Sequence, residues 1–129
     1  MLRIWGRVNS VNVKKAMWCV AELGLPHERI DAGGAFGKTD TPEYLAMNPN
    51  KLIPTLQDGD FSMFESSAIV RHLVRKHGTG TLWPANERQA AHADQWMEWA
   101  TTTLYPDITT SIFLGLIRTP ATSRNTAAI

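Results

Sequence analysis

A proline stands inside the apolar run Leu52-Ile53-Pro54-Thr55-Leu56, whose other residues favour a β-strand. Proline has no N–H to donate to a sheet, so it is excluded from the middle of a central strand. We therefore expect a tight turn at the entrance of the strand, with the bond before Pro54 either trans or cis. Such a turn leaves backbone groups near Ile53 open to pairing with another extended segment.

Shortly after this turn, Phe64-Glu65-Ser66 places a carboxylate beside a hydroxyl at the start of a helical pattern. The first turn of a helix has unpaired N–H groups and the positive end of the helix dipole, and both attract an anion. Glu65 and Ser66 together therefore suit the amine and the carboxylate of a small peptide. An ordinary helix cap is the alternative interpretation of the same two residues.

Hydrophobic periodicity predicts a strand, a helix and a strand, followed by two strands and a helix. The strands are expected at 2–6, 27–31, 55–57 and 61–64, and the helices at 13–20, 44–47 and 66–77. The first two strands should pair in parallel, and Asp58-Gly59 predicts an antiparallel hairpin between the last two. Gly78 is expected as a left-handed cap. This βαβ-ββα order predicts an α/β, thioredoxin-like domain over residues 1–79.

A second, all-helical unit is expected over residues 80–129. After a linker at 79–85, apolar residues recur at helical spacing at Ala93, Trp96, Met97, Ala100, Leu104 and Ile108. Thr119-Pro120 breaks this pattern, and a tail ending at Ala127-Ala128-Ile129 follows. A helix with this much apolar surface needs partners, so we expect dimerisation to cover part of it.

Composition narrows the class of protein. The 129 residues carry a formal net charge of +1, which gives no electrostatic case for nucleic acid or an anionic membrane. No apolar run is long enough for a signal peptide or a membrane helix, so we expect a cytoplasmic protein. Cys19 is the single cysteine and falls inside a helical pattern, which favours a buried structural thiol over redox chemistry.

Two other kinds of site are disfavoured. The segment 32–39 fits a relaxed nucleotide-binding loop, but Ala32 replaces the first glycine and Pro42 breaks the helix that should follow. The four histidines, His27, His72, His77 and His92, show no paired metal-ligand spacing. We therefore expect neither a phosphate-binding loop nor a metal site.

Four segments in order resemble the glutathione transferase superfamily, especially its bacterial members. They are Ser10-Val11-Asn12, Asn48-Pro49-Asn50, Leu52-Ile53-Pro54-Thr55-Leu56 and Phe64-Glu65-Ser66. The resemblance implies a thioredoxin-like domain that binds glutathione and a helical domain that supplies most of the second-substrate pocket. It covers about the first hundred residues, and family chains are longer, so we expect the helical domain to be incomplete here.

The resemblance also implies roles for individual residues. Ile53 matches the residue whose backbone pairs with the cysteinyl part of glutathione, and Pro54, as the cis-proline, sets that geometry. Glu65 matches the residue that binds the γ-glutamyl ammonium, and Ser66 the one that binds its carboxylate. Lys51 and Lys38 remain open as contacts for the glycine carboxylate.

The catalytic assignment falls on the start of the first helix. A free thiol has a pKa of about 8.5, so at neutral pH the nucleophilic thiolate needs a stabiliser. The resemblance gives this role to the hydroxyl of Ser10 with the amide of Asn12, while Asn9 beside them stays open as the donor. Capping of the helix by Ser10 or Asn12 is the structural alternative.

The sequence thus predicts a glutathione transferase that activates the glutathione thiol for attack on a small electrophile. Glutathione is a co-substrate in this reaction, and no cofactor or metal is expected. The expected partners are glutathione, the electrophile and a second copy of the chain. Two alternatives stay open: glutathione-dependent reduction of small disulfides, and a non-catalytic binding or interaction module on the same fold.

Overall fold

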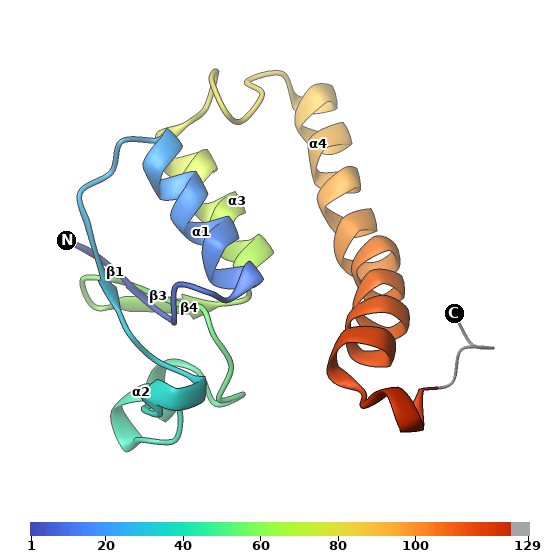
Figure 1. Cartoon of the computed structure of the whole chain (residues 1–129). Coiled ribbons are helices and arrows are strands. Elements are labelled where there is room, and N and C mark those ends of the chain that lie inside the picture. The colour runs from blue at the N-terminus through green and yellow to red at the C-terminus, as the bar shows by residue number, and fades with distance from the viewer. Residues whose placement is uncertain (125–129) are drawn as a thin grey trace. The chain divides into compact units, whose positions relative to one another are not determined.

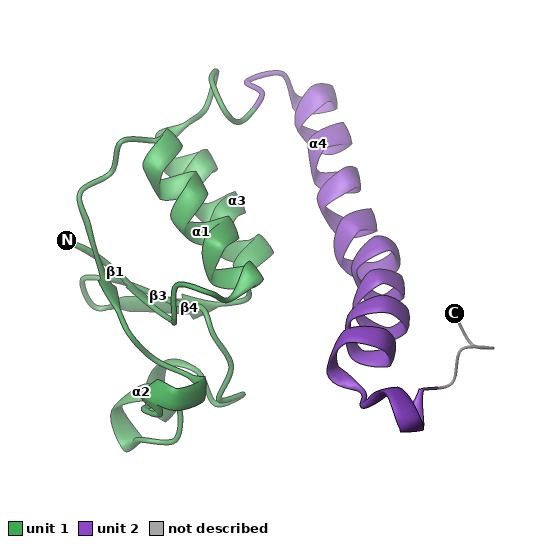
Figure 2. Ribbon diagram, viewed as in Figure 1, with its two compact units in different colours: residues 1–83 green, residues 84–129 purple. Residues whose placement is uncertain are grey.

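The computed structural model describes residues 1–124, and the chain divides into two compact units, 1–83 and 84–129 (Figure 2). The first unit is built on one four-stranded sheet, and the second is helical (Figure 1). No helix within residues 1–124 is long and apolar enough to cross a membrane.

The first unit has the predicted βαβ-ββα order. Its elements are β1 (Leu2–Trp5), α1 (Val11–Glu22), β2 (His27–Ile30), the 3-10 turn η1 (Gly34–Phe36), α2 (Pro42–Met47), β3 (Thr55–Asp58), β4 (Phe61–Phe64) and α3 (Ser66–His77). The strands lie in the order β2-β1-β3-β4, with β1 and β2 parallel and the other neighbours antiparallel. The expected thioredoxin-like fold is therefore confirmed.

Helices cover both faces of this sheet, with α1 and α3 packed together on one side and α2 on the other (Figure 1). Side chains alternate along a strand, so neighbouring residues of β1 enter different cores. Ile4 pairs with Leu56, and both are fully buried. The next residue, Trp5, packs with Tyr44 of α2 and Ala32, with the Trp5 and Tyr44 ring centroids 5.9 Å apart.

Two local predictions differ from the structure. Asp58 pairs with Phe61, so the hairpin turn is Gly59-Asp60, one residue later than Asp58-Gly59. Gly78 ends α3 with a φ of −126°, so the predicted left-handed cap is wrong. Glycine suits this position for another reason: a Cβ there would lie 2.8 Å from Cδ2 of Leu23 and 3.2 Å from the Val74 carbonyl oxygen.

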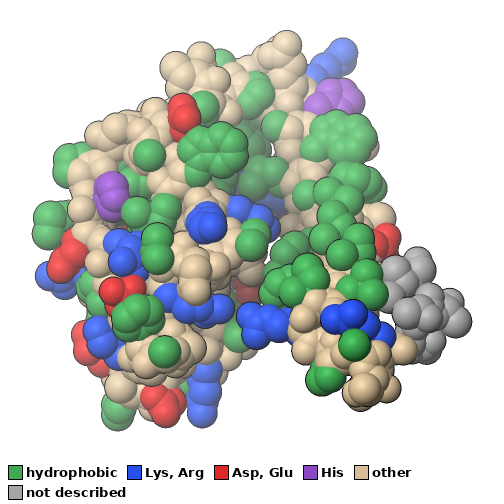
Figure 3. Space-filling model, viewed as in Figure 1, with side chains coloured by type: hydrophobic (Ala, Val, Ile, Leu, Met, Phe, Trp, Pro, Cys, Tyr) green, Lys and Arg blue, Asp and Glu red, His purple; other side chains and the backbone are tan. Residues whose placement is uncertain are grey.

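The second unit begins with α4 (Glu87–Trp99), whose first turn is capped by the Asn86 side chain accepting from the Gln89 N–H. The helix continues through two π-helical segments, η2 (Ala100–Leu104) and η3 (Asp107–Arg118), and a short 3-10 turn, η4 (Ala121–Ser123), follows. Large apolar side chains of this unit are exposed, Trp96 and Ile108 among them. Hydrophobic side chains gather in a column on the face of the helical unit that Figure 3 shows. The predicted tail at 127–129 lies outside the described residues.

An ion pair joins the hairpin of the first unit to α3. Lys76 Nζ lies 2.6 Å from Asp58 Oδ2, and this contact lowers the pKa of the Asp58 carboxyl below its ordinary value of 3.8. A lowered folded-state pKa stabilises the fold at neutral pH, and the contribution is lost as pH falls through that pKa. Because half of the Lys76 side chain is exposed, the pair contributes little.

We predict that Asp58→Asn lowers the free energy of unfolding by about 0.5 kcal/mol at pH 7, and that this difference shrinks as the pH falls below about 4. Urea unfolding at pH 7 and pH 3 measures both values. Asp60→Asn is the control, since Asp60 makes no ion pair within the described residues and the variant should be equally stable at both pH values relative to wild type. A loss for Asp58→Asn that grows toward pH 3 would contradict this assignment.

Candidate functional site

One edge of the sheet gathers every candidate residue. Because β1, β2 and β4 point the same way and β3 points the opposite way, the residues after those three strands and before β3 meet at one edge. The connections follow the strand order: the loop after β2, the turn from β1 into α1, the Ile53-Pro54 turn, and the start of α3. Ser10, Asn12, Ile53, Pro54, Glu65 and Ser66 all belong to these connections.

A small hollow of about 60 Å³ opens at this edge. It is lined by residues from four segments: Asn12, Asn48, Leu52, Ile53, Pro54, Glu65 and Ser66. The structure thus brings five of the six predicted residues together, while Ser10 is not part of the lining. The volume of the hollow suits one polar end of a ligand, so the rest of the ligand would lie outside the hollow.

A buried hydrogen-bond cluster holds the turn before β3. Tyr44 Oη and Asn48 Nδ2 both donate to the carbonyl oxygen of Leu52, at 2.5 and 2.9 Å. Asn48 Nδ2 also donates to Thr55 Oγ1, which in turn donates to Tyr44 Oη. All three side chains are buried, and burial raises the pKa of the Tyr44 hydroxyl. The cluster therefore fixes both ends of the Ile53-Pro54 step, whose peptide bond is cis.

The backbone of Ile53 is left open by this arrangement. Its side chain packs beside the cluster of Trp5, Ala32 and Tyr44. Within residues 1–124, neither its N–H nor its carbonyl oxygen makes a hydrogen bond. An extended chain lying along this residue would supply the missing partners, as the sequence predicts.

Glu65 and Ser66 begin α3 without forming an ordinary cap. The Glu65 side chain makes no capping hydrogen bond and is exposed, and its φ of 71° is unusual for a residue other than glycine. Lys38 and Lys51 are the other two non-glycine residues with positive φ in the described part of the chain. Ser66 is buried, and its Oγ donates to Asn12 Oδ1 at 3.4 Å, which links the starts of α3 and α1.

Ser10 occupies the N-cap of α1, and its Oγ accepts from the Val13 N–H at a long 3.5 Å. The capping alternative for this residue is therefore confirmed. Capping uses one lone pair and leaves the hydroxyl proton available for donation. Asn9 is exposed, and of the three candidate donors only Asn12 lines the hollow.

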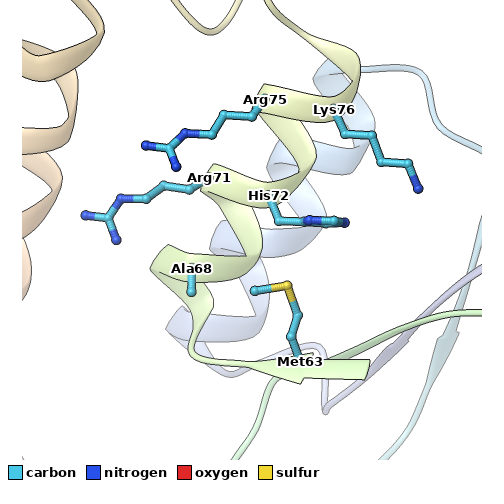
Figure 4. A pocket seen from close by; sticks show the side chains of 6 residues that line it. All are labelled: Met63, Ala68, Arg71, His72, Arg75 and Lys76. Carbon is cyan, nitrogen blue, oxygen red and sulfur yellow. The ribbon is translucent and has the colours of Figure 1, made fainter. Parts of the chain in front are cut away.

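A second hollow, of about 540 Å³, lies along α3 and holds none of the predicted residues. It is lined by Met63, Ala68, Arg71, His72, Arg75 and Lys76 (Figure 4). Arg71 and Arg75 project together on one side of the helix, and His72 and Lys76 on the other. Lys76 is paired with Asp58, and Arg75 stacks over the Trp83 ring, so these cations already have protein partners.

Metal binding, a reactive cysteine and a phosphate-binding loop find less support in the described residues. No three of the His, Cys, Asp and Glu side chains in residues 1–124 lie close enough to hold a metal ion together. Cys19 is buried, as expected, and burial raises the pKa of its thiol, which disfavours a reactive thiolate. The glycine-rich segment 32–39 forms the short turn η1, and no helix follows Lys38-Thr39 directly.

Comparison with known proteins identifies the family. The family described as "Glutathione S-transferase, N-terminal domain" matches residues 1–75. This chain belongs to the glutathione S-transferase family. It is 45% identical to glutathione S-transferase GstB of Escherichia coli, an alignment that covers all of this chain and 62% of that protein. It is also 36% identical to glutathione S-transferase 4 of Zea mays over 75% of this chain and 44% of that protein.

Solved structures of glutathione transferases show the same fold. The theta class enzyme of Xanthomonas axonopodis pv. citri, solved with glutathione bound, superposes with a TM-score of 0.86 at 45% identity. That match covers 99% of this chain and 61% of the other. The chain thus spans about three fifths of the length of these two bacterial relatives.

Sequence reasoning missed two residues of this edge. Asn48 stood in one of the four segments that carry the family resemblance, but no role was predicted for its side chain, which is a hub of the buried cluster. An Asn placed between a helix and an X-Pro turn was the available signal. Arg7 follows β1 directly and lies at the same edge, but an isolated arginine in a turn has no distinctive pattern.

We predict that Asn48→Ala lowers the free energy of unfolding by about 2 to 3 kcal/mol, because it removes three hydrogen bonds of the Asn48 side chain, to Leu52, Thr55 and the Asn50 N–H. Urea titration followed by tryptophan fluorescence measures the change. Asn50→Ala is the matched control, since this side chain is exposed and should change stability by less than about 0.5 kcal/mol. Equal losses in the two variants would show that the cluster does not hold the turn.

We predict that Glu65→Gly raises the free energy of unfolding by about 0.5 to 1 kcal/mol, because glycine adopts a φ of 71° without steric cost. Glu65→Gln keeps the strained backbone and should match wild type in stability. Thermal and urea unfolding of the three proteins give the comparison. A Glu65→Gly variant less stable than Glu65→Gln would mean that this backbone conformation is not strained.

Proposed function

We propose that this chain binds glutathione along the strand-end edge and activates its thiol. The observation that carries the proposal is the open backbone of Ile53 beside the hollow formed by Asn12, Glu65 and Ser66. An extended peptide pairs with such a backbone as an added strand. Membership of the glutathione S-transferase family makes glutathione the peptide to test.

The two ends of the γ-glutamyl group find complementary charges at the start of α3. The exposed Glu65 carboxylate suits the ammonium, and an ion pair with hydrogen bonds is stronger than a neutral contact. The first N–H groups of α3 suit the carboxylate, because the helix N-terminus attracts an anion. The Ser66 hydroxyl joins them by turning its proton from Asn12 Oδ1, a long 3.4 Å bond, to the carboxylate. The Glu65 side chain makes no capping hydrogen bond, so its carboxylate is not used by the helix start.

The cysteinyl sulfur is proposed to lie near the start of α1. There the Ser10 hydroxyl donates to the thiolate while its oxygen accepts from Val13. The N-terminus of α1 adds a favourable dipole, and the amide of Asn12 is a second donor from the same turn. Since one pKa unit corresponds to about 1.36 kcal/mol, one charge-assisted hydrogen bond of about 1.5 to 3 kcal/mol lowers the thiol pKa by one to two units.

The thiolate then attacks an electrophilic carbon of a small molecule. A carbon–sulfur bond forms with the electron pair of the thiolate, and the leaving group departs with the electron pair of the bond that breaks. Ser10 acts as a hydrogen-bond donor throughout and forms no covalent bond itself. The proposal assigns residues 1–79 to glutathione and 80–129 to the start of the helical domain that contacts the electrophile.

We predict that Ser10→Ala raises the pKa of the bound glutathione thiol by at least one unit and lowers kcat/KM at pH 7 by about tenfold to a hundredfold. Ser10→Thr keeps the hydroxyl and should retain most of the activity. Ultraviolet absorbance of the thiolate against pH, with turnover of a halogenated aromatic, measures both quantities. Loss of the cap costs about 1 kcal/mol of stability, so folding is checked in parallel.

An unchanged thiol pKa in Ser10→Ala would remove Ser10 from this role. The same titration on Asn12→Ala and Asn9→Ala then identifies the donor, because only the variant that lacks it shows the raised pKa. Calorimetry with glutathione on the wild-type chain tests the proposal as a whole, and no binding at millimolar ligand would overturn it. Turnover of a model disulfide, compared with the halogenated aromatic, separates transfer from disulfide reduction.

A further inference from the structure

We propose that Arg7 binds the glycine carboxylate of glutathione, an inference that rests on the proposed binding of glutathione at this edge. The family resemblance left the glycine carboxylate to Lys51 or Lys38. The structure offers a different cation, held by the turn between β1 and α1.

The direction of the bound peptide follows from the strand order. Glu65 and Ser66 follow β4, Ile53-Pro54 precedes β3, Arg7 follows β1, and Gly33-Gly34 follow β2. A peptide with its γ-glutamyl end at β4 and its cysteine at β3 therefore continues toward β1 and β2. Two strand spacings are about 9.5 Å, which three extended residues span at about 3.3 Å each. The third residue of the peptide therefore reaches the region of Arg7.

The arginine side chain is seated on a glycine pair at this place. A Cβ built on Gly33 would lie 3.5 Å from Nη1 of Arg7 and 3.1 Å from Cδ1 of Ile53. A Cβ on Gly34 would lie 3.5 Å from Cδ of Arg7. Both glycines have positive φ, so the loop turns in a way that other residues rarely adopt. The guanidinium is thereby held next to Ile53, the residue proposed to pair with the cysteinyl backbone.

The Arg7 guanidinium has no protein partner in the described part of the chain. Within residues 1–124, Arg7 makes no side-chain hydrogen bond or ion pair, although it is only partly exposed. Asp31, the acidic residue that follows β2 at the same edge, is paired with Arg29, which also donates to the Gly6 carbonyl oxygen. A partly buried cation that no carboxylate neutralises favours an anionic ligand.

Arginine suits this ligand better than the two lysines do. Its planar guanidinium donates two parallel hydrogen bonds to one carboxylate, and it loses less freedom on binding because its geometry is fixed. Lys38 and Lys51 are both exposed, so ordering either side chain on a ligand costs more conformational entropy. The glycine carboxylate therefore pairs with Arg7.

Calorimetry with glutathione and with its glycine ethyl ester tests this contact, because the ester replaces the charged carboxylate with a neutral group that carries an added ethyl. Wild type is expected to bind glutathione about tenfold more tightly than the ester, as expected for one charge-assisted contact. In Arg7→Gln, glutathione binding should fall to the level of the ester, while ester binding stays unchanged. Arg7→Lys keeps the charge but not the paired hydrogen bonds and should retain part of the preference.

Arg3→Gln is the matched control, since it removes the same charge from β1 at an exposed ion pair with Glu28. It should keep the full tenfold preference. A preference retained by Arg7→Gln, or lost in Lys38→Gln or Lys51→Gln instead, would overturn the assignment of Arg7 and leave the proposed function standing. If wild type bound neither compound, both the proposed function and this inference would fail. Circular dichroism confirms folding, and Arg7→Lys decides the matter if Arg7→Gln does not fold.

Discussion

The carbonyl oxygen of Leu52 is the point on which the site depends. Two buried donors from α2, Tyr44 and Asn48, converge on this one acceptor, and Thr55 closes the cluster at the start of β3. Because unpaired polar groups are costly in a core, the three side chains tolerate few other arrangements. The cluster also holds the neighbouring Ile53, whose backbone N–H and carbonyl oxygen make no hydrogen bond within residues 1–124. One rigid cluster thus fixes the segment proposed to receive the ligand.

Sheet topology determines what surrounds that segment. Since three strands end and one begins at the same edge, four connections meet there, and two of them lead directly into the N-termini of α1 and α3. Helix N-termini carry partial positive charge and unpaired N–H groups, so this edge favours anions. The link from Ser66 to Asn12 holds the two helix starts together. The opposite edge of the sheet holds the hairpin turn and the chain's first residue. Neither α1 nor α3 begins there.

The element order was predictable from sequence because it rests on local patterns of periodicity and turn residues. Pro54 and the pair Glu65-Ser66 marked two of the segments that line the hollow, whereas Asn12 was singled out by the family resemblance. The errors arose where contacts between distant segments determine the local backbone conformation. Pairing of Asp58 with Phe61 carries β3 one residue further than expected and moves the turn to Gly59-Asp60. At Gly78, close approach of Leu23 requires the glycine, while its backbone is not left-handed. The partners of Asn48, Leu52 and Thr55, are close in sequence, but only the folded turn before β3 brings them onto its side chain. Arg7 has no sequence signature, because its place beside Gly33 and Gly34 depends on the fold.

The three non-glycine residues with positive φ have a consequence for how this protein tolerates change. Lys38, Lys51 and Glu65 lie in the connections that leave β2, enter β3 and leave β4, at the edge proposed to bind glutathione. Strained backbone of this kind is a reserve of stability that substitution by glycine or asparagine releases. Heat-resistant variants should therefore be easiest to obtain at the same edge of the sheet that is proposed to bind the ligand. Selection for thermal tolerance alone is therefore expected to replace residues of the proposed site while the fold stays intact.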